Sequence, residues 1–154
     1  MPQFWLVKSE AAVYSIDDLK KDRATSWTGI RNYQARNFMR DQMKPGDLVL
    51  YYHSNSDPTG IAGIAKVSKL AGPDATAFDK KSEYYDPKAT KDDPIWCAVE
   101  LSFVEKFSTV VTLEQLKADS RLQGMPVLQR GQRLSVMPIS AEHFKIVCEL
   151  ANTK

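Results

Sequence analysis

The chain has 154 residues, a formal net charge of +2, and apolar and charged fractions of 43% and 26%. These values are typical of one soluble globular domain that can bury a core. No apolar run approaches the roughly 18 to 20 residues of a membrane helix, and residues 1–8 lack the basic and then apolar pattern of a signal peptide. We therefore expect a single domain over residues 1–154, without a membrane partner. Its expected location is the cytoplasm or, in a eukaryote, also the nucleus.

The two cysteines, Cys97 and Cys148, lie far apart in the sequence and in apolar contexts. They have no Cys-x-x-Cys or Cys/His ligand spacing, so we predict no metal site. Two buried thiols are expected; a disulfide is the alternative, which a reducing compartment disfavours. The sequence also lacks a Walker loop and a dinucleotide-binding fingerprint, and we predict no cofactor.

The N-terminal half predicts two strands and two helices. Ser15 and Asp18 have the spacing of a capping box, which begins a short helix. Pro45-Gly46-Asp47 is a strong turn signal. The expected elements are a strand over residues 4–8, a helix over 16–21, a helix over 32–42 and a strand over 48–53.

The C-terminal half predicts more strands around a long loop. Residues 71–94 contain glycine, proline and many charges without a period, which indicates a surface loop with at most one short helix or strand near Tyr84 and Tyr85. Thr112 and Gln115 form a second capping box. The other expected elements are strands over 60–70, 95–107 and 134–138, a helix ending near 118, and a helix after Ser140 with Phe144, Val147, Cys148 and Ala151 toward the core.

The order of these elements indicates the fold class. Strands mix with short helices without the regular alternation of a doubly wound sheet. A hairpin across residues 54–59 would join two of the strands. We predict an α+β domain with a strongly bent, mostly antiparallel sheet or small β-barrel, flanked by short helices.

Residues 27–38 read W-T-G-I-R-N-Y-Q-A-R-N-F and form the most informative stretch. Aromatic rings, an amide and two guanidinium groups gather around Gly29, at the junction of a loop and a helix N-terminus. This mixture suits a site that stacks a flat polar ligand such as a nucleobase. Trp27 would stack on the base and Asn32 would read its edge. The alternatives are a core role for Trp27 and an N-cap role for Asn32, which also fit.

Polar and aromatic residues also stand where predicted strands begin or end. Lys8-Ser9-Glu10 follows the first strand, and Tyr52-His53-Ser54 ends a later one. Such residues emerge at the rim of a sheet and can contact a ligand. The alternatives are a surface ion pair between Lys8 and Glu10, a structural His53, and core packing for Trp96, which opens another strand.

Basic residues are concentrated in two segments. Residues 23–44 contain four arginines and Lys44 against one acid, Asp41, and residues 121–133 contain three arginines and no acid. Two such segments on a near-neutral chain indicate a local phosphate contact. Gly131, between Arg130 and Arg133, would let the backbone approach a ligand. The alternatives are solvated or paired arginines and a plain turn before the last strand.

Motifs along almost the whole chain resemble one known family. They are F-W-L-V-K-S-E, S-I-D-D-L, W-x-G-I-R-N-Y-Q-A-R-N-F, K-P-G-D-L-V-L-Y-Y-H-S, G-I-A-G-I-A-K-V, Y-Y-D-P-K, P-x-W-C-A-V and Q-R-G-Q-R-L-S-V. Together they resemble the EVE domain family. The resemblance implies a PUA-like fold, similar to YTH domains and more distantly to PUA and ASCH domains. It also implies the reading of a modified base in DNA or RNA.

Carried over by position, the resemblance implies an aromatic and polar base-binding pocket. Its members would be Lys8, Ser9, Glu10, Trp27, Gly29, Ile30, Arg31, Asn32, Tyr33, Tyr52, His53, Ser54, Trp96, Arg130, Gly131, Arg133, Leu134 and Ser135. Contacts to phosphate would come from Arg31, Arg36, Arg130 and Arg133. Family members usually have proline after the Lys-Ser-Glu run, where this chain has Ala11, so the loop here lacks a preset φ.

The residues do not contain a convincing catalytic constellation, because neither cysteine has a histidine near it in sequence. Our first hypothesis is therefore a non-catalytic module that binds nucleic acid carrying a modified base. The alternative is an ASCH-like enzyme that acts on a modified nucleoside or small amide, with Lys8, Glu10 or His53 as acid or base. A third hypothesis is a protein-interaction domain with a vestigial pocket.

Overall fold

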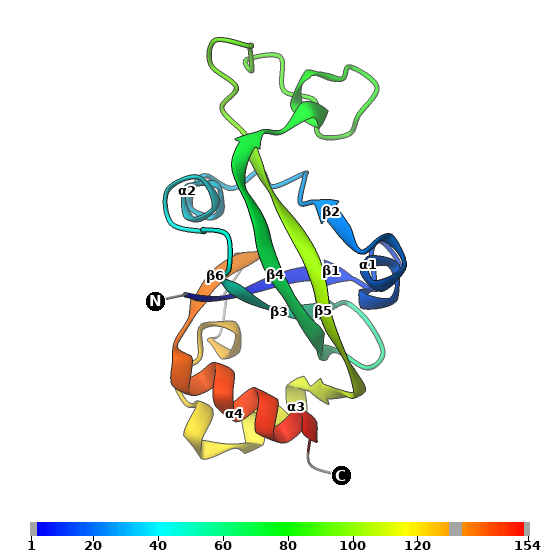
Figure 1. The fold of residues 1–154 in the computed structure, drawn as a ribbon, viewed down its shortest axis with the longest axis vertical. Coiled ribbons are helices and arrows are strands. Elements are labelled where there is room, and N and C mark those ends of the chain that lie inside the picture. Colours follow the sequence, from blue (N-terminus) through cyan, green and yellow to red (C-terminus); the bar gives the residue numbers. More distant parts are fainter. Residues whose placement is uncertain (1–2, 130–133, 153–154) are drawn as a thin grey trace.

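The computed structural model describes residues 3–129 and 134–152. Within these residues, six strands form one mixed sheet in the order β2-β5-β4-β3-β1-β6. Figure 1 shows the two longest strands, β4 and β5, side by side along the long axis, with a long loop at one end. The strands are β1 (Phe4–Glu10), β2 (Ala24–Ser26), β3 (Leu48–Ser54), β4 (Gly60–Pro73), β5 (Cys97–Thr112) and β6 (Val136–Ile139).

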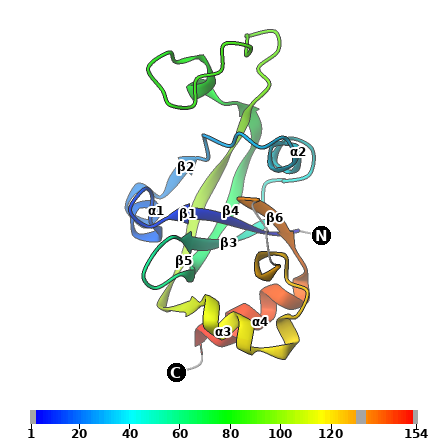
Figure 2. The same ribbon diagram turned by 180° about the vertical axis from the view of Figure 1, so that it is seen from behind.

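In the described part of the chain, four α-helices and three short 3-10 helices accompany the sheet. Figure 2 shows α3 and α4 together at the end of the molecule opposite the long loop. The helices are α1 (Ile16–Asp22), α2 (Tyr33–Asp41), α3 (Leu113–Ala118) and α4 (Ala141–Asn152), with η1 (Ala75–Phe78), η2 (Ser120–Leu122) and η3 (Pro126–Leu128). The helix starts predicted from capping residues are confirmed: Ser15 and Thr112 form capping boxes, and Asn32 caps α2.

The sheet is bent but not closed. β1 runs parallel to β3, and the other neighbouring strands are antiparallel. Repeated register shifts between β4 and β5 bend this long pair. β2 and β6 remain the two edges of the sheet within the described residues. The α+β class with a bent, mostly antiparallel sheet is thus confirmed, whereas the predicted alternative of a small β-barrel does not describe this open sheet. The edge strands β2 and β6 have only three and four residues, and they do not pair with each other within the described residues.

Alternating residues of the strands divide the core into two clusters. Trp5 and Val7 belong to the first cluster, which also contains Trp27 and the buried side chains of α1 and α2. Leu6 belongs to the second cluster, together with Leu116 of α3 and the apolar face of α4. The candidate site described below borders the first cluster, so its geometry depends on that packing.

The main differences from the sequence-based prediction concern β2, β5 and the region between β4 and β5. β2 was not predicted, because three residues carry too little pattern. β5 begins at Cys97 and not at residue 95, since Ile95 has a φ of 61°, which lies outside the β region. β5 also continues to Thr112, because Ile61 pairs with Val111 at the far end of the hairpin. The predicted surface loop contains η1, and β4 extends to Pro73.

The described residues contain no group of three or more metal-binding side chains, and no helix among them is long and apolar enough to cross a membrane. Both cysteines are free. Cys97 is buried, as predicted, whereas Cys148 is half-buried. Burial raises the pKa of both thiols, which disfavours the reactive thiolate.

Candidate functional site

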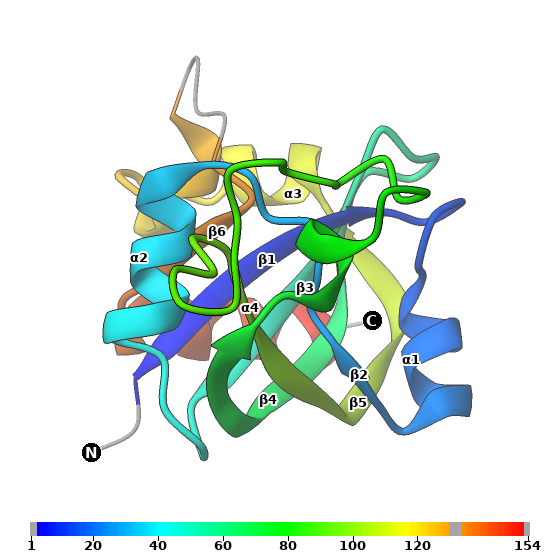
Figure 3. The same cartoon turned by 90° about the horizontal axis from the view of Figure 1, so that it is seen from above.

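A cavity of about 830 Å³ opens beside the ends of β1 and β3. The segment that joins β2 to α2 forms another side of the cavity. Figure 3 shows the loop after β4 passing over this segment. Eight of the predicted base-binding residues line this cavity. They are Lys8, Ser9, Glu10, Trp27, Gly29, Ile30, Ser54 and Ser135.

The parallel pairing of β1 and β3 brings two of these segments together. Ser9 is in register with His53, and Glu10 with Ser54. Because the strands run in the same direction, their C-terminal ends meet at one edge of the sheet. The backbone N–H of Lys8 also donates to the carbonyl of Ser135 at 2.9 Å. One wall of the cavity is therefore polar and comes from three separate segments.

Trp27 forms part of the apolar wall and is also a core residue, only 8% exposed. Its ring makes an edge contact with Tyr51, with centroids 5.5 Å apart, and another with Tyr14 at 6.5 Å. These neighbours fix the orientation of the indole, so Trp27 is a core residue that also lines the cavity. Burial and a hydrogen bond to Asp22 raise the pKa of Tyr14 to about 12, which keeps its hydroxyl protonated.

Tyr84 lies against the backbone of Gly29. Gly29 has a φ of +83°, and a Cβ atom there would be 2.8 Å from the Tyr84 ring. The residue must therefore be glycine for the conformation and also for the close approach. The carboxylate of Asp74 accepts a hydrogen bond from the Gly29 N–H at 2.8 Å. The loop and the β2–α2 segment are thereby joined at this point.

Arg31 secures the same junction from the other side. Its guanidinium donates to the Tyr84 carbonyl, the Ile30 carbonyl, Asp74 and Thr76 through five hydrogen bonds. A guanidinium has five N–H donors, and all are used here. Asp74 is fully buried; burial alone would raise its pKa, but hydrogen bonds from Thr76, Gly29 and Arg31 hold the pKa below its usual value. This geometry does not favour the predicted phosphate contact of Arg31.

Lys8 is the one basic residue among the described residues that line the cavity. Its side chain is half-buried, which lowers the pKa of the amine. The Nζ atom lies 5.8 Å from the Tyr52 ring. No ion pair joins Lys8 or Glu10 to a described residue. The surface ion pair between these two side chains, considered from the sequence, is therefore absent, and both residues line the cavity.

Several predicted site residues do not line the cavity. Asn32 Oδ1 accepts from the Ala35 N–H at 3.0 Å, as an N-cap. His53 is buried, and its Nε2 accepts from the Ile16 N–H at 3.2 Å. Tyr52 is a core residue, and Leu134 packs against both core clusters. Their positions fit the structural alternatives, because each side chain has its partners inside the protein.

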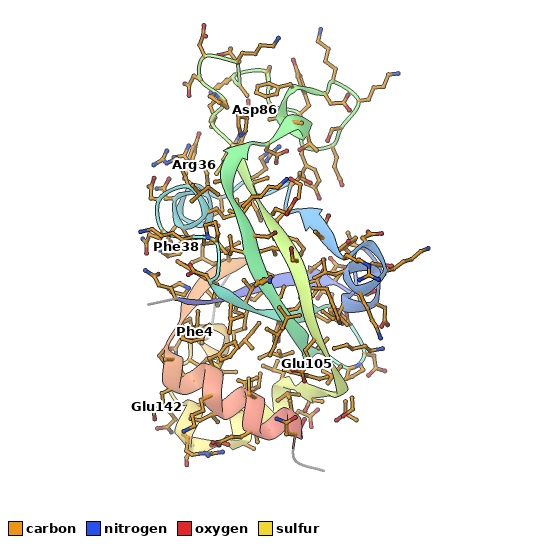
Figure 4. All side chains as sticks on the ribbon, viewed as in Figure 1. Phe4, Arg36, Phe38, Asp86, Glu105 and Glu142 are labelled. Carbon is orange, nitrogen blue, oxygen red and sulfur yellow. The ribbon has the colours of Figure 1, made fainter. Side chains whose placement is uncertain are left out.

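Tyr33 and Trp96 are also outside the cavity, but they contact each other. Their rings are 4.8 Å apart and nearly parallel, at 27°. The Trp96 indole donates to Asp86 at 2.7 Å, and Arg36 donates to the carbonyl of Ile95 at 2.9 Å. Figure 4 shows Arg36 on α2, below the loop that carries Asp86. The predicted residues Arg130, Gly131 and Arg133 lie outside the described residues.

Seven lining residues were missing from the predicted pocket: Val13, Tyr14, Thr25, Ser26, Thr28, Asn55 and Tyr84. Tyr84 belongs to the Y-Y-D-P-K motif, which was a signal for a role at the site. The others come from a turn, a loop and the unpredicted strand β2. Their sequence patterns do not indicate where these segments meet.

The sequence model of the EVE domain matches residues 3–150. The chain belongs to the EVE domain family. Human thymocyte nuclear protein 1 is 40% identical over 164 residues, which covers 95% of this chain and 72% of the human protein. An uncharacterised protein of Schizosaccharomyces pombe is 32% identical over 97% of this chain and 68% of its own length.

Solved structures agree with this EVE domain fold. A protein of Pseudomonas syringae is 46% identical with a TM-score of 0.92, covering 96% of this chain and 99% of its own. The human THYN1 protein, in complex with DNA that contains 5-methylcytosine, is 38% identical with a TM-score of 0.91 and covers 99% of both chains. An ASCH protein of Zymomonas mobilis is 8% identical with a TM-score of 0.54, covering 96% and 98% of the two chains. That likeness concerns the fold alone.

Proposed function

We propose that this EVE domain binds DNA carrying a modified base and holds that base in the cavity between Trp27, Tyr84 and the ends of β1 and β3. The observation that carries the proposal is a cavity with aromatic walls on one side and hydroxyl and charged groups on the other. The complex of human THYN1 with 5-methylcytosine DNA supports the same class of ligand. The base-binding role of each lining residue is part of the proposal.

The size and lining of the cavity suit a nucleotide. Small-ligand pockets have volumes of about 300 to 1,000 Å³, and the volume here is about 830 Å³. Trp27 and Tyr84 offer ring surface on which a base can stack. The hydroxyl groups of Ser9, Thr28 and Ser54 can donate to or accept from its edge.

Lys8 and Glu10 provide a donor and an acceptor for the base or its phosphate. The exocyclic amino group of cytosine is a donor that a carboxylate accepts well, and Glu10 can take this role. The Lys8 ammonium can donate to a carbonyl oxygen of the base or to the adjacent phosphate. Neither group has an ion-pair partner among the described residues, so a ligand does not have to displace one.

The methyl group of a modified base contributes a limited part of the affinity. Burying one carbon stabilises the complex by about 0.8 kcal/mol, which corresponds to roughly fourfold tighter binding. The apolar side chains of Val13 and Ile30 line the cavity and can cover such a group. Extruding a base from a duplex costs a few kcal/mol, so we expect single strands and mismatched sites to bind more tightly than matched duplexes.

Fluorescence anisotropy titrations test this proposal. The probes are oligonucleotides of one sequence, with 5-methylcytosine or cytosine at one position, as single and double strands and as RNA. The variants are Trp27→Phe, Ser9→Ala and Glu10→Gln, with Lys106→Gln as a control outside the cavity. We expect preference for the modified base and weaker binding in the three cavity variants. Equal binding of both bases, unchanged in the variants, would overturn the proposal.

The same cavity defines what an enzymatic alternative requires. Lys8 and Glu10 line the cavity, whereas His53 is engaged by Ile16. An acid–base reaction there would have to use the first two residues. We propose a non-catalytic role. Conversion of a modified nucleoside by the wild-type protein, abolished in Glu10→Gln, would contradict it.

A further inference from the structure

A row of aromatic rings and guanidinium groups leads from the cavity to the surface of α2. Tyr84 lines the cavity. The guanidinium carbon of Arg31 lies 5.5 Å from the Tyr84 ring and 5.2 Å from the Trp96 ring. Trp96 in turn stacks on Tyr33 at 4.8 Å. Arg31 and Trp96 are held by hydrogen bonds to the loop and to Asp74, so the row is rigid where it supports Tyr33.

Tyr33 presents one uncovered ring face at the end of this row. The residue is 59% exposed although Trp96 covers one face of its ring. The guanidinium of Arg36 lies 4.8 Å from the Tyr33 ring and 5.9 Å from the Trp96 ring. If Arg36 lay over the outer face of Tyr33, its distance from the Trp96 ring would be roughly twice the 4.8 Å that separates the two rings. The observed distance of 5.9 Å is much shorter. Arg36 therefore lies beside the pair, and the outer face of Tyr33 stays open.

Packing in the core does not explain why residue 33 is a tyrosine, since its side chain is largely exposed. No hydrogen bond joins its hydroxyl to a described residue, and its neighbour Gln34 is also exposed. Arg36 donates to Asn37 twice and to Ile95 once, and no described residue accepts from its other two N–H groups. An open ring beside a guanidinium with unused donors has the features of a base-stacking and phosphate-binding surface.

We propose that the outer face of Tyr33 stacks a second base of the bound strand, close to the base in the cavity, while Arg36 contacts the backbone between them. This inference rests on the proposed function, since the same strand occupies both places. Tyr33 follows Ile30 of the cavity wall by three residues, which span at most about 11 Å. The two stacking sites are therefore near enough for bases that are a few nucleotides apart on one single strand.

The test distinguishes the loss of stacking on the Tyr33 ring from a general disturbance of the fold. Tyr33→Leu removes the ring and Tyr33→Phe keeps it; Tyr85→Leu, at a residue that is 36% exposed, is the matched control. We expect Tyr33→Leu to weaken binding of a single-stranded 5-methylcytosine oligonucleotide about 5- to 150-fold, the equivalent of one stacked base, about 1 to 3 kcal/mol. Tyr33→Phe and Tyr85→Leu should bind like the wild type. Binding of the single nucleoside 5-methyldeoxycytidine should be unchanged in all three.

Abasic substitution provides the second readout. Single bases that flank the 5-methylcytosine are removed one at a time. At one position, the loss of the base should weaken strand binding by the wild type. The same loss should not change strand binding by Tyr33→Leu, because this variant already lacks the ring on which that base stacks. The inference would be overturned if Tyr33→Leu bound every strand as tightly as the wild type does. It would also be overturned if Tyr33→Leu lost the same factor of affinity for the strand and for the nucleoside. Equal affinity for cytosine and 5-methylcytosine strands, with the Tyr33 dependence intact, would overturn the proposed function and leave the stacking site standing.

Discussion

The ring of Tyr84 occupies the space that a side chain at Gly29 would need, with a Cβ atom there only 2.8 Å from the ring. The contact joins the loop after β4 to the segment before α2, and both residues line the cavity. Asp74 and Arg31 hold the two segments at this spacing. The shape of the candidate site therefore depends on a residue without a side chain.

Gly29→Ala should lower both stability and DNA affinity. Gly124 has a similar φ of +86°, but beyond its chain neighbours no described atom lies within 4 Å of the place that a Cβ would take there, so Gly124→Ala carries the backbone strain without the clash. We expect each variant to lose about 1 kcal/mol of unfolding free energy from φ alone. Only Gly29→Ala should weaken binding, because Tyr84 must move. Urea denaturation and anisotropy titration measure the two effects; equal affinities of the two variants would contradict the role of this contact.

Asp74→Asn should destabilise the fold near neutral pH, since it leaves the charge of Arg31 without its partner at a largely buried position. The difference in unfolding free energy from the wild type should be a few kcal/mol at pH 7. The pKa of Asp74 lies below its usual value. Its stabilising contribution is therefore present above the unfolded-state pKa of about 3.9 and is lost as the pH falls through the lower folded-state pKa. Denaturation at pH 7 and pH 3 should show this difference shrinking; exposed Asp92→Asn is the control.

His53 should make the protein less stable in mild acid. Burial lowers the pKa of its imidazole, partly offset by Asp17, and the neutral ring accepts a hydrogen bond from Ile16. Because the folded-state pKa is below the unfolded value of about 6.5, the unfolded chain gains the proton first. Stability therefore falls as pH drops below about 6.5, by at most about 1.4 kcal/mol per pH unit.

His53→Gln should flatten this dependence, since glutamine offers an acceptor that does not titrate in this range. His143→Gln, at the only other histidine, should retain the wild-type slope. Thermal or urea unfolding between pH 5 and pH 7.5 measures both. Identical slopes for His53→Gln and the wild type would show that His53 does not contribute.

Arg36→Gln should weaken DNA binding in a salt-dependent manner. Losing one phosphate contact lowers the slope of log affinity against log salt by about 0.7 for a single strand. Arg40→Gln, on the same helix and paired with Asp41, is the control and should keep the slope. Titrations from 50 to 300 mM salt provide the measurement, and an unchanged slope in Arg36→Gln would exclude a phosphate contact.

Local signals predicted much of the fold. The capping residues Ser15, Asn32 and Thr112 satisfy helix N–H groups within a few positions, so their pattern is readable from the sequence. β2 could not be predicted, because its three residues form a strand only by pairing with β5. The start of β5 was also misplaced, since the positive φ of Ile95 depends on the loop before it.

The candidate site was predictable only in part. Lys8 to Glu10 and Ser54 do line the cavity at the ends of β1 and β3, whereas Tyr52 and His53 are buried. The meeting of the two segments depends on parallel pairing between residues far apart in the chain, such as Phe4 with Leu48. Asn32 and His53 each fitted two roles. The cap of Asn32 on Ala35 is local and was one of the predicted alternatives, whereas Ile16, the partner of His53, is far away in the sequence and is found only in three dimensions. Arg31 carried a charge that suggested phosphate, yet its donors are used inside the protein.

Whether the cavity holds a modified base can be decided by a single comparison of affinities. Binding of the wild-type protein is measured for two single-stranded DNA oligonucleotides that differ only in 5-methylcytosine against cytosine, at one fixed salt concentration. We predict at least about fourfold tighter binding of the methylated strand, and weaker binding of both strands in Glu10→Gln, because the two bases share the amino group that Glu10 would accept from. Equal affinities for the two strands would contradict the proposed role of the cavity.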